Sequence, residues 1–228
     1  SDVYKRQGVV SKLGTSVSTF YPVHNTELMP EDPLQAIRSG NAADVDVLIG
    51  SNSDETTLWG HGDVDDTKLQ RIAAEYNVTN GVSTYRANRP DASAAQLLVA
   101  LTSDHMFRIP GIRLAEAQTE HTPNVWMYLF DWKSRAFDGR LGATHALEIP
   151  FAFNNLDRAG VDIFIGPGPI PQHLADTMHD AWSAFIKNGT LDWPSYTLAQ
   201  RATMVFDDSS ATVDDPMSED RIIWEGVR

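Results

Sequence analysis

The segment VDVLIGSNSDETTLWG, at residues 45–60, joins a short apolar run to a polar turn. Its first half is β-branched and bounded by polar residues, which is typical of a buried parallel strand. Its second half contains SNSDE, whose residues favour turns and helix N-termini. The apolar segment PNVWMYLFDW, at residues 123–132, predicts a second strand of the same kind.

Helical patterns alternate with these strands. We predict helices at residues 33–40, 65–76, 91–109, 111–120 and 171–189. Asp65 and Asp91 are the expected N-caps of the second and third helices, and Gly189 is expected to end the last. Two short strands with a turn between them are predicted at residues 202–208 and 211–215. The alternation indicates an α/β fold with a mostly parallel sheet flanked by helices.

Glu55 follows the first strong strand, and His145 follows the second. In open parallel sheets, ligands bind beyond the carboxyl ends of the strands, so both residues belong to the edge where a site would form. A histidine can take a proton from a hydroxyl and return it to a leaving group, while a carboxylate behind it orients the ring. A core histidine and a metal ligand are the alternatives that these residues leave open.

Four segments, taken in order, resemble type-B carboxylesterases, the family of carboxylesterases, para-nitrobenzyl esterases and cholinesterases. VDVLIGSNSDETTLWG resembles the segment that carries the family's catalytic acid, and GATHALEIPFAFNNLD, at residues 142–157, resembles its histidine segment. Residues 20–40 and 180–208 resemble the loop and helix before the acid and the C-terminal helix with its tail. The resemblance runs from about Phe20 to Trp224.

The resemblance implies an α/β-hydrolase fold, of which this chain is the C-terminal portion. Glu55 matches the triad acid and His145 the triad base, in the order that α/β hydrolases use. Leu58 and Trp59 match positions that often line the substrate gorge. The implied substrate is a small carboxylic ester, and the resemblance implies no metal and no organic cofactor.

The chain departs from the family pattern at the acid turn and in the loop before it. Thr56 stands where the family usually has Gly, and His24-Asn25 replaces the usual Asp-Gly. The sequence contains no G-x-S-x-G and no Gly-rich oxyanion segment; GTSVS, at residues 14–18, comes nearest but lacks the final Gly. We therefore expect the chain to contribute two members of a Ser-Glu-His triad and to be inactive alone. The alternative is a non-catalytic cholinesterase-like interaction module.

The N-terminus and the composition bear on domains and partners. SDVYKRQ, at residues 1–7, lacks an initiator Met and is interpreted as a non-native scar, with residues 8–228 as the C-terminal portion of one domain whose N-terminal half is missing. The net charge of -13 disfavours nucleic-acid and anionic-membrane partners. There is no cysteine, which excludes thiol chemistry, and no apolar run of the roughly 20 residues that a membrane span needs. Compartment and oligomeric state are not indicated.

Other side chains have structural interpretations. Glu148 is interpreted as an ion-pair partner or helix cap, and Asp54 as a cap or hydrogen-bond acceptor of the acid's own turn. Trp59 fits a pocket wall and the core equally well. His173 and His179 lie six residues apart, on different helical faces, which argues against a shared metal. His61, His105 and His121 are interpreted as surface or core residues, and Asp104 as a structural residue. The aromatic residues Phe151, Phe153 and Phe164 are interpreted as core and not as an acyl pocket.

Overall fold

A four-stranded sheet forms the centre of the computed structural model, which describes residues 23–227. The parallel strands β1 (Val47–Asn52), β2 (Val125–Phe130) and β3 (Ala202–Phe206) lie side by side in that order. The short strand β4 (Ala211–Asp214) pairs antiparallel with β3. The mostly parallel sheet is therefore confirmed. Residues 1–7 and GTSVS lie outside the described residues.

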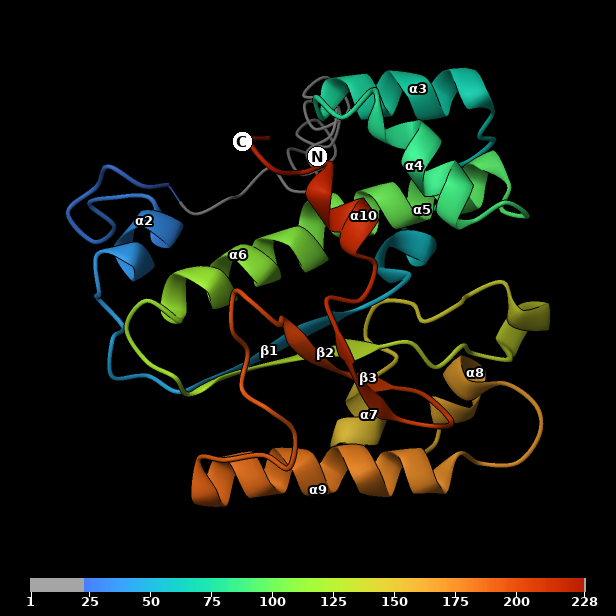
Figure 1. The fold of residues 1–228 in the computed structure, drawn as a ribbon. Coiled ribbons are helices and arrows are strands. Elements are labelled where there is room, and N and C mark those ends of the chain that lie inside the picture. The colour runs from blue at the N-terminus through green and yellow to red at the C-terminus, as the bar shows by residue number, and fades with distance from the viewer. Residues whose placement is uncertain (1–22, 228) are drawn as a thin grey trace, which may run out of the picture.

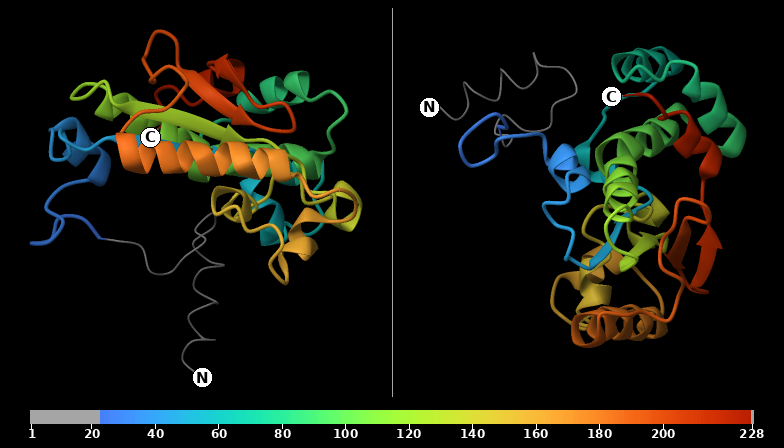
Figure 2. Two further views of the ribbon diagram at one scale, coloured as in Figure 1. Left: turned by 90° about the horizontal axis from the view of Figure 1, so that it is seen from below. Right: turned by 60° about the vertical axis from the view of Figure 1, so that its left-hand side comes forward.

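Helices cover both faces of the sheet. Figures 1 and 2 show α6 (Ile109–Gln118) along one face and α9 (Gln172–Asn188) along the other. Side chains of β2 alternate between the two sides, so that Val125 and Met127 join one apolar core and Trp126 and Phe130 join the other. This alternation is why β2 reads as a continuous apolar run in the sequence.

The strand β1, which the sequence predicts to be buried, is only partly buried within the described chain. Among the described strands it lies at the edge of the sheet, and its residues 47–50 are only half-buried. Ser51 and Asn52, at its carboxyl end, are buried. The strand therefore becomes buried just where it leads into Glu55.

The helices agree with the sequence patterns in type and largely in extent. The remaining α-helices are α2 (Pro33–Arg38), α3 (Asp66–Glu75), α4 (Gly81–Asn88), α5 (Ala94–Ser103), α7 (Ile149–Ala152), α8 (Val161–Ile165) and α10 (Ser218–Ile222). Asp65 caps α3 as expected, and α9 ends at Gly189, whose φ of 67° is left-handed. The sequence patterns did not predict α4 or the short helices α7, α8 and α10. Among the described helices, none is long and apolar enough to cross a membrane.

Two local expectations were wrong. The cap of α5 is Ser93, in a capping box with Gln96, and not Asp91. The helices predicted at 91–109 and 111–120 form one continuous helix, because a π-helical turn, η2 (Asp104–Arg108), joins α5 to α6. Such a turn shifts the direction of the side chains within the helix, and it carries Phe107.

Candidate active site

Glu55 and His145 meet at the carboxyl edge of the sheet, although 90 residues separate them. Glu55 begins the short 3-10 helix η1 (Glu55–Trp59) directly after β1, and His145 lies in the loop between β2 and α7. The Nδ1 atom of His145 lies 2.6 Å from Oε2 of Glu55. The backbone N–H of His145 also donates to the carbonyl of Glu55, at 3.2 Å. The structure thus brings together the two residues that the sequence placed at the strand ends.

The acid is buried, whereas the histidine faces outward. Glu55 is 5% exposed, and its Oε1 accepts a hydrogen bond of 2.9 Å from the backbone N–H of Asn52. Burial raises the pKa of Glu55, and the hydrogen bonds from Asn52 and His145 only partly oppose that shift. The side chain of His145 is 49% exposed.

The carboxylate determines which nitrogen of the neutral ring can accept a proton. An ionised carboxylate only accepts hydrogen bonds, so Nδ1 of His145 carries the hydrogen that points to Glu55. The unprotonated nitrogen is then Nε2. Among the described residues, the side chain of His145 is hydrogen-bonded through Nδ1 alone. The ring can therefore take a proton at Nε2 from a hydroxyl group placed beside it.

Asp54 and Glu148, the other carboxylates close in sequence to the pair, bind other groups. Asp54 accepts a 2.9 Å hydrogen bond from the backbone N–H of Ala143 and forms a 2.8 Å ion pair with Lys133. Its side chain does not cap its own turn, because it points across to the loop of His145; its backbone carbonyl does accept hydrogen bonds from Thr57 in that turn. Glu148 is the N-cap residue of α7, which is one of its two expected roles, and its backbone carbonyl accepts from the N–H of Ala152. Its side chain makes no capping hydrogen bond and accepts one from the side chain of Asn52 instead.

Leu58 and Trp59, predicted to line a substrate gorge, are both partly exposed. Leu58 is 48% and Trp59 39% exposed, so Trp59 lies at the surface beside the site and not in the core. The indole ring centroid lies 5.7 Å from that of His145. Phe107 completes this group, with its ring 5.4 Å from His145 and 5.5 Å from Trp59. The sequence reasoning missed Phe107, because neither its spacing nor its neighbours pointed to the site.

The two departures from the family pattern have local structural explanations. Thr56 is fully buried, and its hydroxyl lies 2.6 Å from that of Thr102, so it connects η1, the turn that begins at Glu55, to α5. Asn25 has a φ of 63°, in the left-handed region that glycine favours and asparagine tolerates. Neither replacement disturbs the contact between Glu55 and His145.

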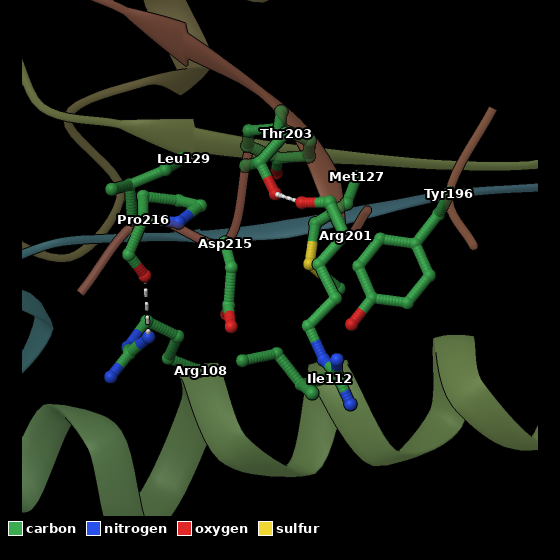
Figure 3. Close-up of a pocket in the computed structure, with 10 residues that line it drawn as sticks. Arg108, Ile112, Met127, Leu129, Tyr196, Arg201, Thr203, Asp215 and Pro216 are labelled. Carbon is green, nitrogen blue, oxygen red and sulfur yellow. Dashed lines mark hydrogen bonds between the residues drawn. The ribbon is translucent and has the colours of Figure 1, made fainter. Parts of the chain in front are cut away.

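A separate cavity lies between α6 and strands β2 and β3 (Figure 3). Its volume is about 20 Å³, far below the roughly 300–1,000 Å³ of typical small-molecule sites. Neither Glu55 nor His145 lines it. Its charged side chains are all paired: Arg108 with Asp104, Arg201 with Glu116 and Asp215 with Arg221. The cavity is therefore a poor candidate for the site.

The other candidate side chains lie elsewhere. No group of three metal-ligating side chains occurs within the described part of the chain. The ring of His105 stacks on Tyr76, and His121 and His179 contact the backbone carbonyls of Arg38 and Ala152, respectively. The rest are placed as follows: His61 beside Thr56, His173 on α9, Phe151 in the core, Phe164 half-buried against it, and Asp104 paired with Arg108. Phe153 is 70% exposed, so its core interpretation was wrong.

Known proteins resemble the chain over most of its length. A sequence profile of the carboxylesterase family matches residues 3–222. The para-nitrobenzyl esterase of Bacillus subtilis (strain 168) is 32% identical over 209 residues, covering 89% of this chain and 42% of the relative. Phenmedipham hydrolase of Pseudarthrobacter oxydans is 30% identical over 217 residues, covering 89% of this chain and 43% of the relative.

A solved structure agrees with these relatives. A carboxylesterase from Geobacillus stearothermophilus superposes with a TM-score of 0.77 at 31% identity, covering 93% of this chain and 47% of that one. The chain thus spans about two fifths of the length of the curated relatives. It has the α/β-hydrolase fold of these esterases, with a mostly parallel sheet flanked by helices. The chain belongs to the carboxylesterase family.

Proposed function

We propose that this chain supplies the acid and the histidine of a Ser-Glu-His triad in a carboxylic-ester hydrolase. The observation that carries the proposal is the 2.6 Å contact between buried Glu55 and half-exposed His145. Residues 8–228 form, on this proposal, the C-terminal portion of a single α/β-hydrolase domain. The nucleophilic serine lies in the remainder of a longer protein, here called the parent protein.

The geometry supports a proton-transfer role for His145. Its Nε2 takes the proton of the serine hydroxyl as the serine attacks the ester carbonyl, and the imidazolium then gives that proton to the departing alcohol. Glu55 keeps Nδ1 protonated and stabilises the imidazolium without itself taking the proton. Water then cleaves the acyl-enzyme by the same route.

The substrate is a small ester with an apolar or aromatic group. Trp59 and Phe107 present aromatic surface beside the ring of His145, and Leu58 extends it. Such surfaces bind apolar substrate groups through burial of area and aromatic stacking. The names of the relatives, para-nitrobenzyl esterase and phenmedipham hydrolase, fit substrates that contain aromatic rings.

Variants of the parent protein test the triad. We expect His145→Ala to lower kcat about 10⁴-fold and Glu55→Gln to lower it about 10³–10⁴-fold. Both variants disable the same proton transfer, from the serine hydroxyl to the ring of His145. The double variant should therefore resemble His145→Ala instead of losing the product of the two factors. The measurement is kcat/KM on one activated aromatic ester, with circular dichroism to check folding.

Two outcomes decide between the hydrolase and a non-catalytic module. A serine-directed phosphonate should label the parent protein at one serine and leave the 228-residue chain alone unlabelled, since this sequence contains no G-x-S-x-G. A folded His145→Ala variant with unchanged activity contradicts the triad. A parent protein that neither hydrolyses esters nor takes the label is an interaction module.

A further inference from the structure

Several hydrogen bonds join the loop that carries Glu55 to the loop that carries His145. The backbone of Asp54 donates to the carbonyl of Ala143 at 3.0 Å, and the carboxylate of Asp54 accepts from the N–H of Ala143 at 2.9 Å. Glu55, the residue after Asp54, binds His145, which lies two residues after Ala143, through both backbone and side chain. The remaining residue of the histidine loop at this point, Thr144, is held by a residue of β1.

That residue is Asn52, the last of β1. Its side-chain Nδ2 donates to the carbonyl of Thr144 at 2.7 Å and to a carboxylate oxygen of Glu148. These acceptors lie one residue before and three residues after His145. The backbone N–H of Asn52 donates to Oε1 of Glu55 at 2.9 Å. Asn52 therefore touches the acid with its backbone and both sides of the histidine turn with its side chain.

The chemistry of this contact suits an amide. A carbonyl and a carboxylate are both acceptors, so the group between them must offer two hydrogens, as an NH₂ group does. Asn52 is 1% exposed, and water cannot replace a missing donor at that depth without a cavity to hold it. Glu148 and the carbonyl of Thr144 together hold the amide with its nitrogen toward the loop.

We propose that Asn52 is a positioning residue for the Glu55–His145 pair and that Glu148 fixes the orientation of its amide. The inference rests on the proposed triad and extends it. Asn52 holds the histidine turn against the acid, so that Nδ1 stays within hydrogen-bond reach of Oε2. A displacement of this turn by about 1 Å costs on the order of 10²-fold in rate, because proton transfer depends on geometry.

Exchanging the amide of Asn52 and the carboxylate of Glu148 between the two positions tests whether their contact affects catalysis or only stability. Asn52→Asp places a carboxylate against Glu148 and the carbonyl of Thr144, and we expect kcat of the parent protein to fall about 10²-fold while KM changes less than about 3-fold. Adding Glu148→Gln returns a donor to the pair with the roles reversed. The double variant Asn52→Asp/Glu148→Gln should recover kcat at least about 10-fold over Asn52→Asp.

Asn88 provides a matched control. Its Nδ2 donates to Oδ1 of the buried Asp220 at 2.8 Å, the same amide-to-carboxylate contact between α4 and α10. Asn88→Asp should lower the melting temperature and leave kcat unchanged. If Asn52→Asp does not fold, Asn52→Ser keeps one donor in a smaller side chain and should lower kcat about 10-fold.

The outcomes separate this inference from the proposed function. A folded Asn52→Asp or Asn52→Ser variant with the parent kcat overturns the positioning role, as does a double variant no better than Asn52→Asp. If His145→Ala and Glu55→Gln keep their activity, the triad itself fails. Loss of kcat in those two variants, with kcat retained in the Asn52 variants, refutes the positioning role alone.

Discussion

Two buried carboxylates, Glu55 and Asp104, have nearly the same exposure and opposite surroundings. Each is 5% exposed. Asp104 binds the guanidinium of Arg108 through both oxygens, at 2.6 and 2.8 Å, and accepts a hydrogen bond from the hydroxyl of Tyr85. Glu55 binds a backbone N–H and the ring of His145. The one carboxylate faces a permanent cation, and the other faces a group that can gain or lose a proton.

The proton affinities follow from these partners. Burial by itself would lower the pKa of Arg108, but the carboxylate of Asp104 outweighs burial and raises that pKa above its usual value. Burial, and then the charge of Asp104, raise the pKa of Tyr85. With their pKa values raised, neither Arg108 nor Tyr85 changes charge near neutral pH. Histidine is the side chain whose ordinary pKa lies nearest neutral pH, so a carboxylate beside it can support proton transfer there.

Removal of Asp104 should have the largest effect on stability. Asp104→Ala leaves the buried guanidinium of Arg108 without its carboxylate, and the free energy of unfolding should fall by about 3–5 kcal/mol. Activity of the remaining folded fraction should stay within a few-fold of the parent, because Asp104 does not contact His145. Urea unfolding of the parent protein, followed by activity per folded molecule, measures both. A loss below about 1 kcal/mol would show that the two carboxylates do not differ as described.

Removal of the indole should change substrate binding by an intermediate amount. Trp59→Ala takes away exposed aromatic surface beside His145, so KM for an aromatic ester should rise about 10-fold, with kcat changing less. Steady-state kinetics on an aromatic and a methyl ester of one acid make the test. Ile186→Ala, on the exposed side of α9, is the control and should change neither constant. Equal rises in KM for both esters would contradict an aromatic contact.

The smallest effect concerns the pH dependence of stability. Because burial raises the pKa of Glu55 above the unfolded value of 4.5, the folded protein binds its proton more readily than the unfolded chain. The contribution of Glu55 is therefore favourable at low pH and is lost as pH rises through the raised pKa. As pH rises from 4 to 8, the melting temperature of Glu55→Gln should therefore increase by about 1–3 °C relative to that of the parent. Thermal unfolding across that range checks the sign; a relative loss would refute it.

Much of the fold was predictable because its causes are local. The apolar run of β2, the Asp65 cap of α3 and the end of α9 at Gly189 each depend on a few neighbouring residues. The N-cap of α5 was predicted wrongly because two nearby residues both suit that position. Ser93 and Asp91 are both good N-caps, and only the packed helix shows which of them binds the N–H of Gln96.

The candidate site was predictable in part for the same reason. The positions of Glu55 and His145 after strands can be seen in the sequence, whereas Phe107 enters through a π-helical turn that no spacing indicated. Asn52 looked like an ordinary turn residue. Its importance comes from two acceptors more than 90 residues away, which only the folded chain brings to it.

The sequence by itself determined the alternation of strands and helices, the parallel sheet, and the presence of an acid and a histidine at its carboxyl edge. These follow from side-chain periodicity and from the chain direction of parallel strands. Only the tertiary structure decided which carboxylate reaches the ring. Asp54, Glu55 and Glu148 are all close in sequence to a strand end or to His145, but η1 turns Glu55 alone toward Nδ1, while Asp54 and Glu148 bind the backbone of Ala143 and the amide of Asn52. The direction of a side chain depends on backbone angles that long-range packing sets, and residue order does not contain them.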